Sequence, residues 1–171
     1  MILYTSALCN LKCTYCFIDK NPILSDIDKK LAESYNSTDY YFNFSKELFE
    51  QDALNEMQFW GGEPSQGLHR VVSILDNFLD YYPNLSHFMM STNLTLPNWF
   101  EEMGNFLAKL GERTDRNFTF SLQLSLDGPE HITDITRGKN TTKLFLQNYE
   151  RLVQEMPKML PPNVCMKAHF K

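Results

Sequence analysis

The chain has 171 residues, of which 43% are hydrophobic and 13% aromatic, and its formal net charge is −5. This composition provides one buried core and excludes an intrinsically disordered protein. Lysines and arginines are scattered rather than clustered, which argues against a nucleic-acid-binding surface. The chain begins directly with a short apolar run, and it has no run long enough to cross a membrane. We therefore expect one cytoplasmic domain.

The first half of the chain alternates short apolar strands with helices. We predict strands at residues 2–5 and 56–60 and a helix at 45–54, separated by a polar insertion at 18–44 that contains a short helix at 26–35. The clearest amphipathic helix begins at Leu68 and continues up to Pro83, because its apolar residues recur every 3.6 positions. The order of these elements is typical of strand–helix units.

The second half continues the alternation. We predict strands at 88–92, 118–126 and 164–170, with helices at 97–110 and 142–156. Within 118–126 apolar and polar residues alternate strictly, as expected when helices cover one face of a strand and a polar cavity lies on the other. Alternating strands and helices imply a parallel sheet. We therefore predict an α/β fold, a partial (β/α) TIM-type barrel with about five parallel strands and helices on its outer face.

Three of the four cysteines lie close together, directly after the first strand. Cys9, Cys13 and Cys16 have the spacing C-x3-C-x2-C. Three thiolates at this spacing can converge on one metal centre if the backbone curls into a loop. Iron–sulfur clusters are held by cysteine thiolates, and three ligands leave one iron of a four-iron cluster open to a small molecule.

Two other uses of these cysteines are weaker. A structural zinc site needs four ligands, but no His, Asp or Glu lies between Cys9 and Cys16, and the four histidines are remote in sequence. A disulfide between cysteines so close in sequence would constrain the chain little, and it would leave one cysteine of the three without a partner. Cys165 is most simply a buried free thiol. We favour a cluster and keep a zinc-binding module as an alternative.

In these residues the sequence resembles the radical S-adenosylmethionine (SAM) enzymes, whose motif is Cys-x3-Cys-x-aromatic-Cys, with Tyr15 at the aromatic position. The resemblance implies a [4Fe-4S] cluster on Cys9, Cys13 and Cys16 that binds S-adenosyl-L-methionine at its open iron. One electron from the cluster then breaks the cofactor's C–S bond, and the 5′-deoxyadenosyl radical takes a hydrogen atom from the substrate. The low potential of such clusters implies a flavodoxin- or ferredoxin-type reductant as a partner.

Two further stretches at strand ends resemble motifs of this family. Gly61-Gly62-Glu63-Pro64 matches the GGE motif, which implies that Glu63 and nearby backbone carbonyls hold the methionyl amine of SAM. Its glycines would let the backbone approach a ligand closely. Without the cysteines, the same residues would predict only a strand-to-helix turn. Ser91-Thr92-Asn93 stands where the family often has Thr-Asn-Gly, with Leu94 in place of the glycine, so Ser91 and Asn93 join the candidate cofactor-binding residues.

The stretch 125–129 (Ser-Leu-Asp-Gly-Pro) resembles the end of the fourth strand in the sulfatase-maturase and peptide-modifying (SPASM-type) branch. The resemblance implies that Ser125 and the downstream Arg137 contact the carboxylate and ribose of SAM, and we include Asp127 with them. The plainer alternatives are a satisfied polar residue in the barrel interior for Ser125 and a solvated loop cation for Arg137. Lys167 and His169 share one face of the last predicted strand, where they either meet substrate or lie at a solvated edge.

A complete core of this family has six strand–helix units, and the resemblance covers five strands here. We expect residues 1–171 to form an incomplete radical SAM core without the C-terminal auxiliary-cluster region of the SPASM-type branch. Two classes of function follow. One is an enzyme that modifies a peptide or another small molecule; the other is a cluster- and SAM-binding half-domain that is inactive without a partner. An exposed edge at the fifth strand would pair with a second copy or a completing chain.

Overall fold

A parallel four-stranded sheet forms the centre of the computed structural model, which describes residues 1–18, 30 and 40–157. The strands lie in the order β1-β2-β3-β4, with bounds β1 (Ile2–Ser6), β2 (Glu56–Gly61), β3 (His87–Thr92) and β4 (Thr119–Leu124). Each sequence-predicted strand among these is confirmed, although β4 is shorter than the predicted 118–126. Of the predicted helix at 26–35 only Lys30 is described, and it is helical. The predicted strand at 164–170, with Cys165, Lys167 and His169, lies outside the described residues.

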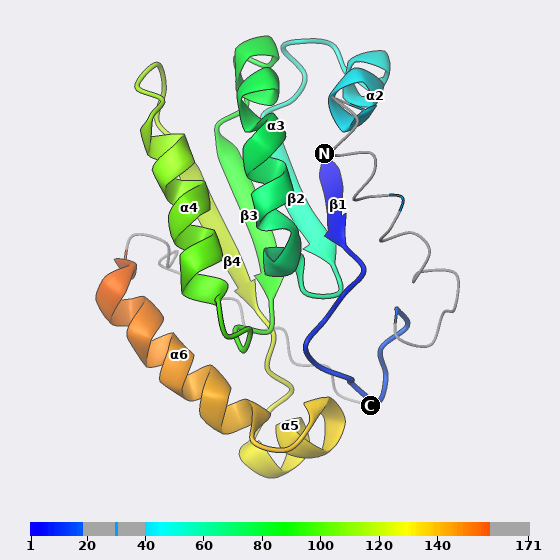
Figure 1. Ribbon diagram of the computed structural model, residues 1–171, viewed down its shortest axis with the longest axis vertical. Helices are drawn as coiled ribbons and strands as arrows, with labels where there is room; N and C mark the ends of the chain where they lie inside the picture. Colours follow the sequence, from blue (N-terminus) through cyan, green and yellow to red (C-terminus); the bar gives the residue numbers. More distant parts are fainter. Residues whose placement is uncertain (19–29, 31–39, 158–171) are drawn as a thin grey trace.

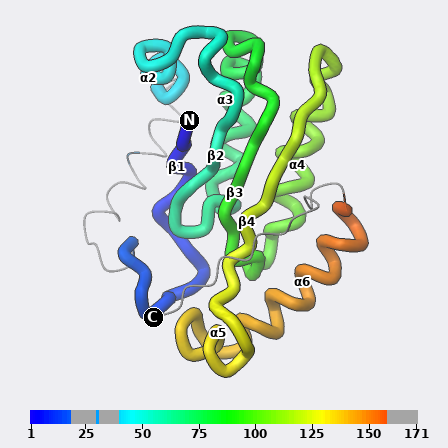
Figure 2. Tube along the Cα trace, turned by 180° about the vertical axis from the view of Figure 1, so that it is seen from behind, coloured from blue at the N-terminus to red at the C-terminus, as the bar shows by residue number. Residues whose placement is uncertain are grey.

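Helices follow the strands, and two of them, α3 (Leu68–Tyr81) and α4 (Trp99–Gly111), cover one face of the sheet. The bounds of the others are α2 (Tyr40–Leu48), the short 3-10 helix η1 (Pro64–Gly67), α5 (Glu130–Arg137) and α6 (Thr141–Glu155). α3 and α4 lie against the sheet in Figure 1, and the view from behind shows the strands in front with no described helix over them (Figure 2). The predicted α/β fold is confirmed, as a partial (β/α) barrel. No helix in the described part of the chain has the length and apolar character needed to span a bilayer.

The core lies between the sheet and the two helices α3 and α4. Phe59 of β2 packs edge-on against Phe106 of α4 at a ring-centroid distance of 5.3 Å, and Phe88 of β3 does so at 5.5 Å. Leu122 and Leu124 of β4 are buried on the same face. The predicted alternation of β4 is therefore confirmed: its apolar side chains face the helices, and its polar side chains face the uncovered side.

The helix predicted at 45–54 is wrong in its position, because α2 runs from Tyr40 to Leu48. Ser45 does not begin a helix but lies inside one. Its hydroxyl donates to the carbonyl of Phe42 at 2.7 Å and accepts from the Tyr82 hydroxyl at 2.8 Å. A serine hydroxyl can cap the start of a helix, or it can bond a carbonyl in the preceding turn of its own helix. Ser45 does the second, and its buried hydrogen bond with Tyr82 holds the hydroxyl in that position.

Helix α5 was not predicted, since no element was expected between the strand at 118–126 and the helix at 142–156. The local signals are nevertheless present. Glu130 lies in the first turn, Arg137 in the last, and Gly138 follows with a positive φ of 121°, an arrangement typical of helix ends. Arg137 is thus held at the end of a helix and is buried. It is not the solvated loop cation of the plainer alternative.

Candidate active site

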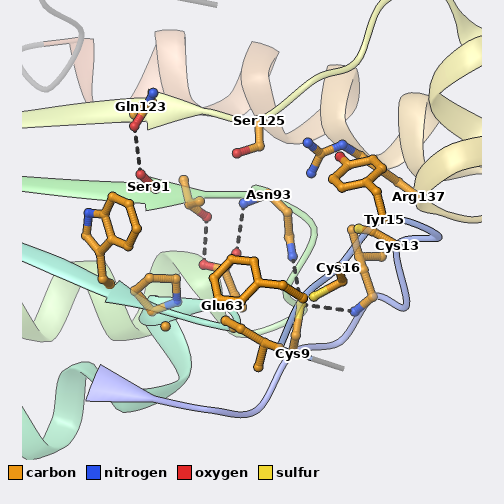
Figure 3. A pocket seen from close by; sticks show the side chains of 18 residues that line it. Cys9, Cys13, Tyr15, Cys16, Glu63, Ser91, Asn93, Gln123, Ser125 and Arg137 are labelled. Carbon is orange, nitrogen blue, oxygen red and sulfur yellow. Dashed lines mark hydrogen bonds between the residues drawn. The ribbon is translucent and has the colours of Figure 1, made fainter. Parts of the chain in front are cut away.

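A cavity of about 270 Å³ lies at the carboxyl ends of the strands, the end of a β/α barrel where active sites gather. Its wall combines the strand ends with the cysteine loop, which we define as residues 7–18 (Figure 3). Eleven of the twelve sequence-predicted site residues line it, namely Cys9, Cys13, Tyr15, Cys16, Gly61, Gly62, Glu63, Ser91, Asn93, Ser125 and Arg137. The exception is Asp127, which accepts hydrogen bonds from Arg137 but does not line the cavity.

The three cysteines of the loop line this cavity and are not bound in disulfides. The sulfur of Cys9 accepts hydrogen bonds from the backbone N–H of Leu11 at 3.4 Å and from the side-chain amide of Asn93 at 3.6 Å. Burial raises the pKa of Cys9 to about 11 and also raises the pKa of Cys13. Without a bound metal these two thiols are therefore protonated at neutral pH, and it is the charge of a metal that would convert them to thiolates.

The cavity presents three cysteine sulfurs, the donor type that holds iron–sulfur clusters. In the described ranges, no group of three or more His, Cys, Asp or Glu side chains is placed to hold one metal ion. In a cluster each thiolate binds a different iron, so the sulfurs need to share a cavity but not a single coordination sphere. Cys9, Cys13 and Cys16 meet that requirement.

The two glycines before Glu63 fix the strand end against the cysteine loop. The backbone N–H of Gly62 donates to the Ser6 carbonyl, and that of Glu63 donates to the Leu8 carbonyl, both at 2.8 Å. A Cβ on Gly61 would lie 2.1 Å from the Ser6 oxygen, and one on Gly62 would lie 2.4 Å from the Leu8 oxygen. The close approach that requires glycine in this structure is therefore to the chain's own backbone, and the expected approach to a ligand stays a prediction.

Glu63 carries a buried carboxylate whose hydrogen-bond donors are all neutral. It is 1% exposed. Its Oε1 accepts from the hydroxyls of Ser65 at 2.7 Å and Thr92 at 2.8 Å, and its Oε2 accepts from the Asn93 N–H at 2.8 Å. The Thr92 oxygen itself accepts from the indole N–H of Trp99 at 3.0 Å, so its own proton points to Glu63.

No Lys, Arg or His within the described ranges forms an ion pair with Glu63. Burial raises the pKa of its carboxyl, although the hydrogen bonds from Asn93, Ser65 and Thr92 oppose that rise. A buried charge is costly unless an opposite charge compensates it. The carboxylate is thus suited to a cationic ligand group in the cavity that it lines.

A second buried polar cluster joins the cysteine loop to α5. Arg137 donates to Asp127 Oδ1 through Nε at 2.9 Å and Nη2 at 2.7 Å, and the Tyr15 hydroxyl donates to the same carboxylate at 2.8 Å. The guanidinium also lies 5.7 Å from the centre of the Tyr15 ring. A backbone bond from Thr14 to the Thr136 carbonyl at 2.8 Å adds to the contact. Asp127 therefore positions Tyr15 and Arg137, which line the cavity, and does not line it itself.

Asp127→Asn should lower the free energy of unfolding by about 3 kcal/mol, because it leaves the Arg137 charge buried without a partner. Burial alone would raise the pKa of Asp127, but the hydrogen bonds from Arg137, Thr136 and Tyr15 outweigh it and lower that pKa. The lowered pKa means that Asp127 stabilises the fold above its ordinary pKa of about 3.9 and loses this effect as pH falls through the folded value. Urea unfolding of both proteins from pH 7 to 3 should show that the difference between their free energies of unfolding shrinks as the pH falls. A difference that stays constant with pH would contradict this account.

Gln123, Trp60 and Phe17 are among the cavity residues that were not predicted as site residues. Gln123 accepts a hydrogen bond from the Ser91 hydroxyl through Oε1 at 2.8 Å. It lies on the polar face of β4, two residues before Ser125. Trp60 and Phe17 are 42% and 73% exposed on the cavity wall. The sequence held a signal for each of them. Gln123 lies on the polar face of an alternating strand, Trp60 directly precedes Gly61, and Phe17 directly follows Cys16.

The family model described as "Radical SAM superfamily" matches residues 3–164 of the chain. The chain belongs to the radical SAM superfamily. A curated relative, the uncharacterised protein MJ0907 of Methanocaldococcus jannaschii, is 31% identical over 147 residues, which are 83% of this chain and 44% of the relative. This radical SAM chain therefore spans less than half of the length of that relative.

A solved structure described as native anSMEcpe with bound AdoMet resembles this radical SAM chain with a TM-score of 0.57 and 25% sequence identity. The match covers 93% of this chain and 42% of that one. The expected resemblance to the superfamily is thereby confirmed, and the finer assignment to the SPASM-type branch stays a prediction.

Proposed function

We propose that this chain binds a [4Fe-4S] cluster through Cys9, Cys13 and Cys16 and binds SAM beside it, as part of an enzyme that modifies a peptide or another small molecule. Once bound, the cluster supplies the electron that splits SAM into methionine and a 5′-deoxyadenosyl radical, which takes hydrogen from the substrate. The observation that carries the proposal is that three cysteine thiols and the buried carboxylate of Glu63, which has no ion-pair partner in the described ranges, line one cavity in a radical SAM chain.

The chain's own residues would divide the binding of SAM between two sides of the cavity. On one side Glu63 offers a negative charge to the methionyl ammonium group. On the other, Asp127 engages Nε and Nη2 of Arg137, so that Nη1 is left to meet the carboxylate of SAM together with the Ser125 hydroxyl. Tyr15, Ser91 and Asn93 complete the wall. Opposite charges at the two ends of the cavity match the zwitterionic methionyl part of the cofactor.

The remaining assignments extend this proposal to partners and location. A flavodoxin- or ferredoxin-type protein would supply the electron, since cysteine-ligated iron–sulfur clusters reach potentials of about −400 mV or lower. Cysteine thiols stay reduced in a reducing compartment, which supports the proposal that the protein is cytoplasmic. The exposed aromatics Trp60 and Phe17 are suited to packing against substrate or cofactor rings.

A second candidate function is a cluster- and SAM-binding half-domain that turns over only with further polypeptide. It is favoured by the coverage of the relatives, which is 44% for MJ0907 and 42% for the solved structure. Association through a fifth strand stays a prediction, because that strand lies outside the described residues.

Product analysis tests the proposed function. The cluster-loaded protein, mixed with SAM and dithionite without oxygen, should form 5′-deoxyadenosine and methionine in equal amounts. The half-domain candidate predicts the same cleavage at a lower rate, with no hydrogen taken from substrate, since an incomplete site admits water and side reactions.

A further inference from the structure

The side chain of Asn93 belongs to a closed ring of hydrogen bonds beside Cys9. Its Oδ1 accepts from both the N–H and the hydroxyl of Thr95 at 2.8 Å, and its Nδ2 donates to Asn10 Oδ1 at 3.0 Å. The Asn10 amide in turn donates to the Thr95 hydroxyl at 2.9 Å. All members of the ring lie at the carboxyl end of β3 or in the cysteine loop. The ring therefore joins the two segments that meet at Cys9.

This ring fixes which way the Asn93 amide points. A backbone N–H can only donate, so the atom of Asn93 that faces the Thr95 N–H has to be the oxygen. The NH2 group is then directed to the other side, where one hydrogen meets Asn10 and the other meets the sulfur of Cys9 at 3.6 Å. Figure 3 shows the amide reaching from the end of the strand to the cysteine loop. The orientation follows from the donors around it.

We propose that Asn93 is a positioning residue that tunes the reduction potential of the cluster by donating an N–H bond to the Cys9 sulfur. The inference rests on the proposed function, because it requires the cluster. One-electron reduction takes the cluster from the 2+ to the 1+ state and places more negative charge on its sulfurs. An N–H donor stabilises the more negative state and raises the potential. Together with the Leu11 N–H, Asn93 gives the Cys9 sulfur two donors.

The test is a redox titration of the reconstituted cluster in the wild-type chain and in Asn93→Ala, with mediators supplying the electron and EPR reporting the reduced state. We expect the midpoint potential of Asn93→Ala to move to a more negative value at the same iron and sulfide content. The matched control is Asn148→Ala, because Asn148 donates to the Leu94 carbonyl in the same loop at 2.8 Å and has no hydrogen bond to a cysteine among the described residues. It should keep the wild-type potential.

A second measurement needs no variant. Wild-type protein labelled with side-chain 15N-asparagine should show a 15N hyperfine coupling to the reduced cluster. Equal potentials in wild type and Asn93→Ala, or a wild-type cluster without this coupling, would overturn the role of Asn93. If Asn93→Ala fails to load a cluster, the 15N coupling decides alone. A wild-type chain that forms no cluster at all would instead overturn the proposed function.

Discussion

Anaerobic reconstitution with iron and sulfide should give about four irons and four sulfides per wild-type chain, as expected for a cluster held by three thiolates. Replacing Cys9, Cys13 or Cys16 by Ala should abolish this content, because each thiolate binds its own iron and the cavity offers no spare sulfur within the described residues. Iron and acid-labile sulfide analysis, with the visible absorption of the cluster, measures the effect directly.

Cys165→Ala is the matched control for these three variants, since it removes one thiol of the same chain outside the motif. It should keep the full iron and sulfide content. One equivalent of zinc without sulfide, found in wild-type protein prepared without oxygen, would contradict the cluster and return the site to the zinc alternative.

Glu63→Gln should weaken SAM binding to the cluster-loaded protein by about 1.5 to 3 kcal/mol, the range for a hydrogen bond to a charged group. The substitution removes the charge that we assign to the methionyl ammonium, while the side chain keeps nearly the same size. It also turns an amide nitrogen toward donors that Glu63 now accepts from, so unfolding should be measured alongside binding. Titration calorimetry under anaerobic conditions gives the affinity.

The pH dependence separates the charge of Glu63 from its packing. Because burial raises the pKa of this carboxyl, it protonates on acidification before an ordinary glutamate would, above about pH 4.3. SAM binding to the wild type should therefore weaken as pH falls through the raised pKa, and the contribution of Glu63 to that fall should be absent in Glu63→Gln. Ser65→Ala removes one donor to the carboxylate but keeps its charge, so it should change the affinity less. Equal affinities for wild type and Glu63→Gln would reduce Glu63 to a turn residue.

The sheet could be predicted from the sequence because its strands carry strong local signals. Phe59 and Phe88 lie in short apolar runs that end at Gly61 and Thr92, and alternation of helices with such runs predicts parallel order. The same rule placed the cysteines and Glu63 at one edge of the sheet, where the structure has them. Helix α5 was missed because its eight residues are mostly polar and its two exposed isoleucines, Ile132 and Ile135, give no buried stripe.

The pairings within the site could not be predicted, because they join residues far apart in sequence. Tyr15 and Asp127 are separated by 112 positions, and Cys9 and Asn93 by 84. A motif indicates which residues gather at a strand end but not which atoms bond one another. This is why Asp127 was expected to bind cofactor, whereas the structure uses both of its oxygens to hold Tyr15 and Arg137.

The most direct test of radical SAM function in this chain is the formation of 5′-deoxyadenosine by wild-type protein and by Cys13→Ala, prepared identically and assayed with SAM and dithionite without oxygen. Liquid chromatography with mass spectrometry counts the product per cluster. Wild-type protein should release 5′-deoxyadenosine and methionine in equal amounts, and Cys13→Ala should release no more than a protein-free control. The same trace of product from wild type, Cys13→Ala and the protein-free mixture, with a full cluster in the wild type, would contradict the account.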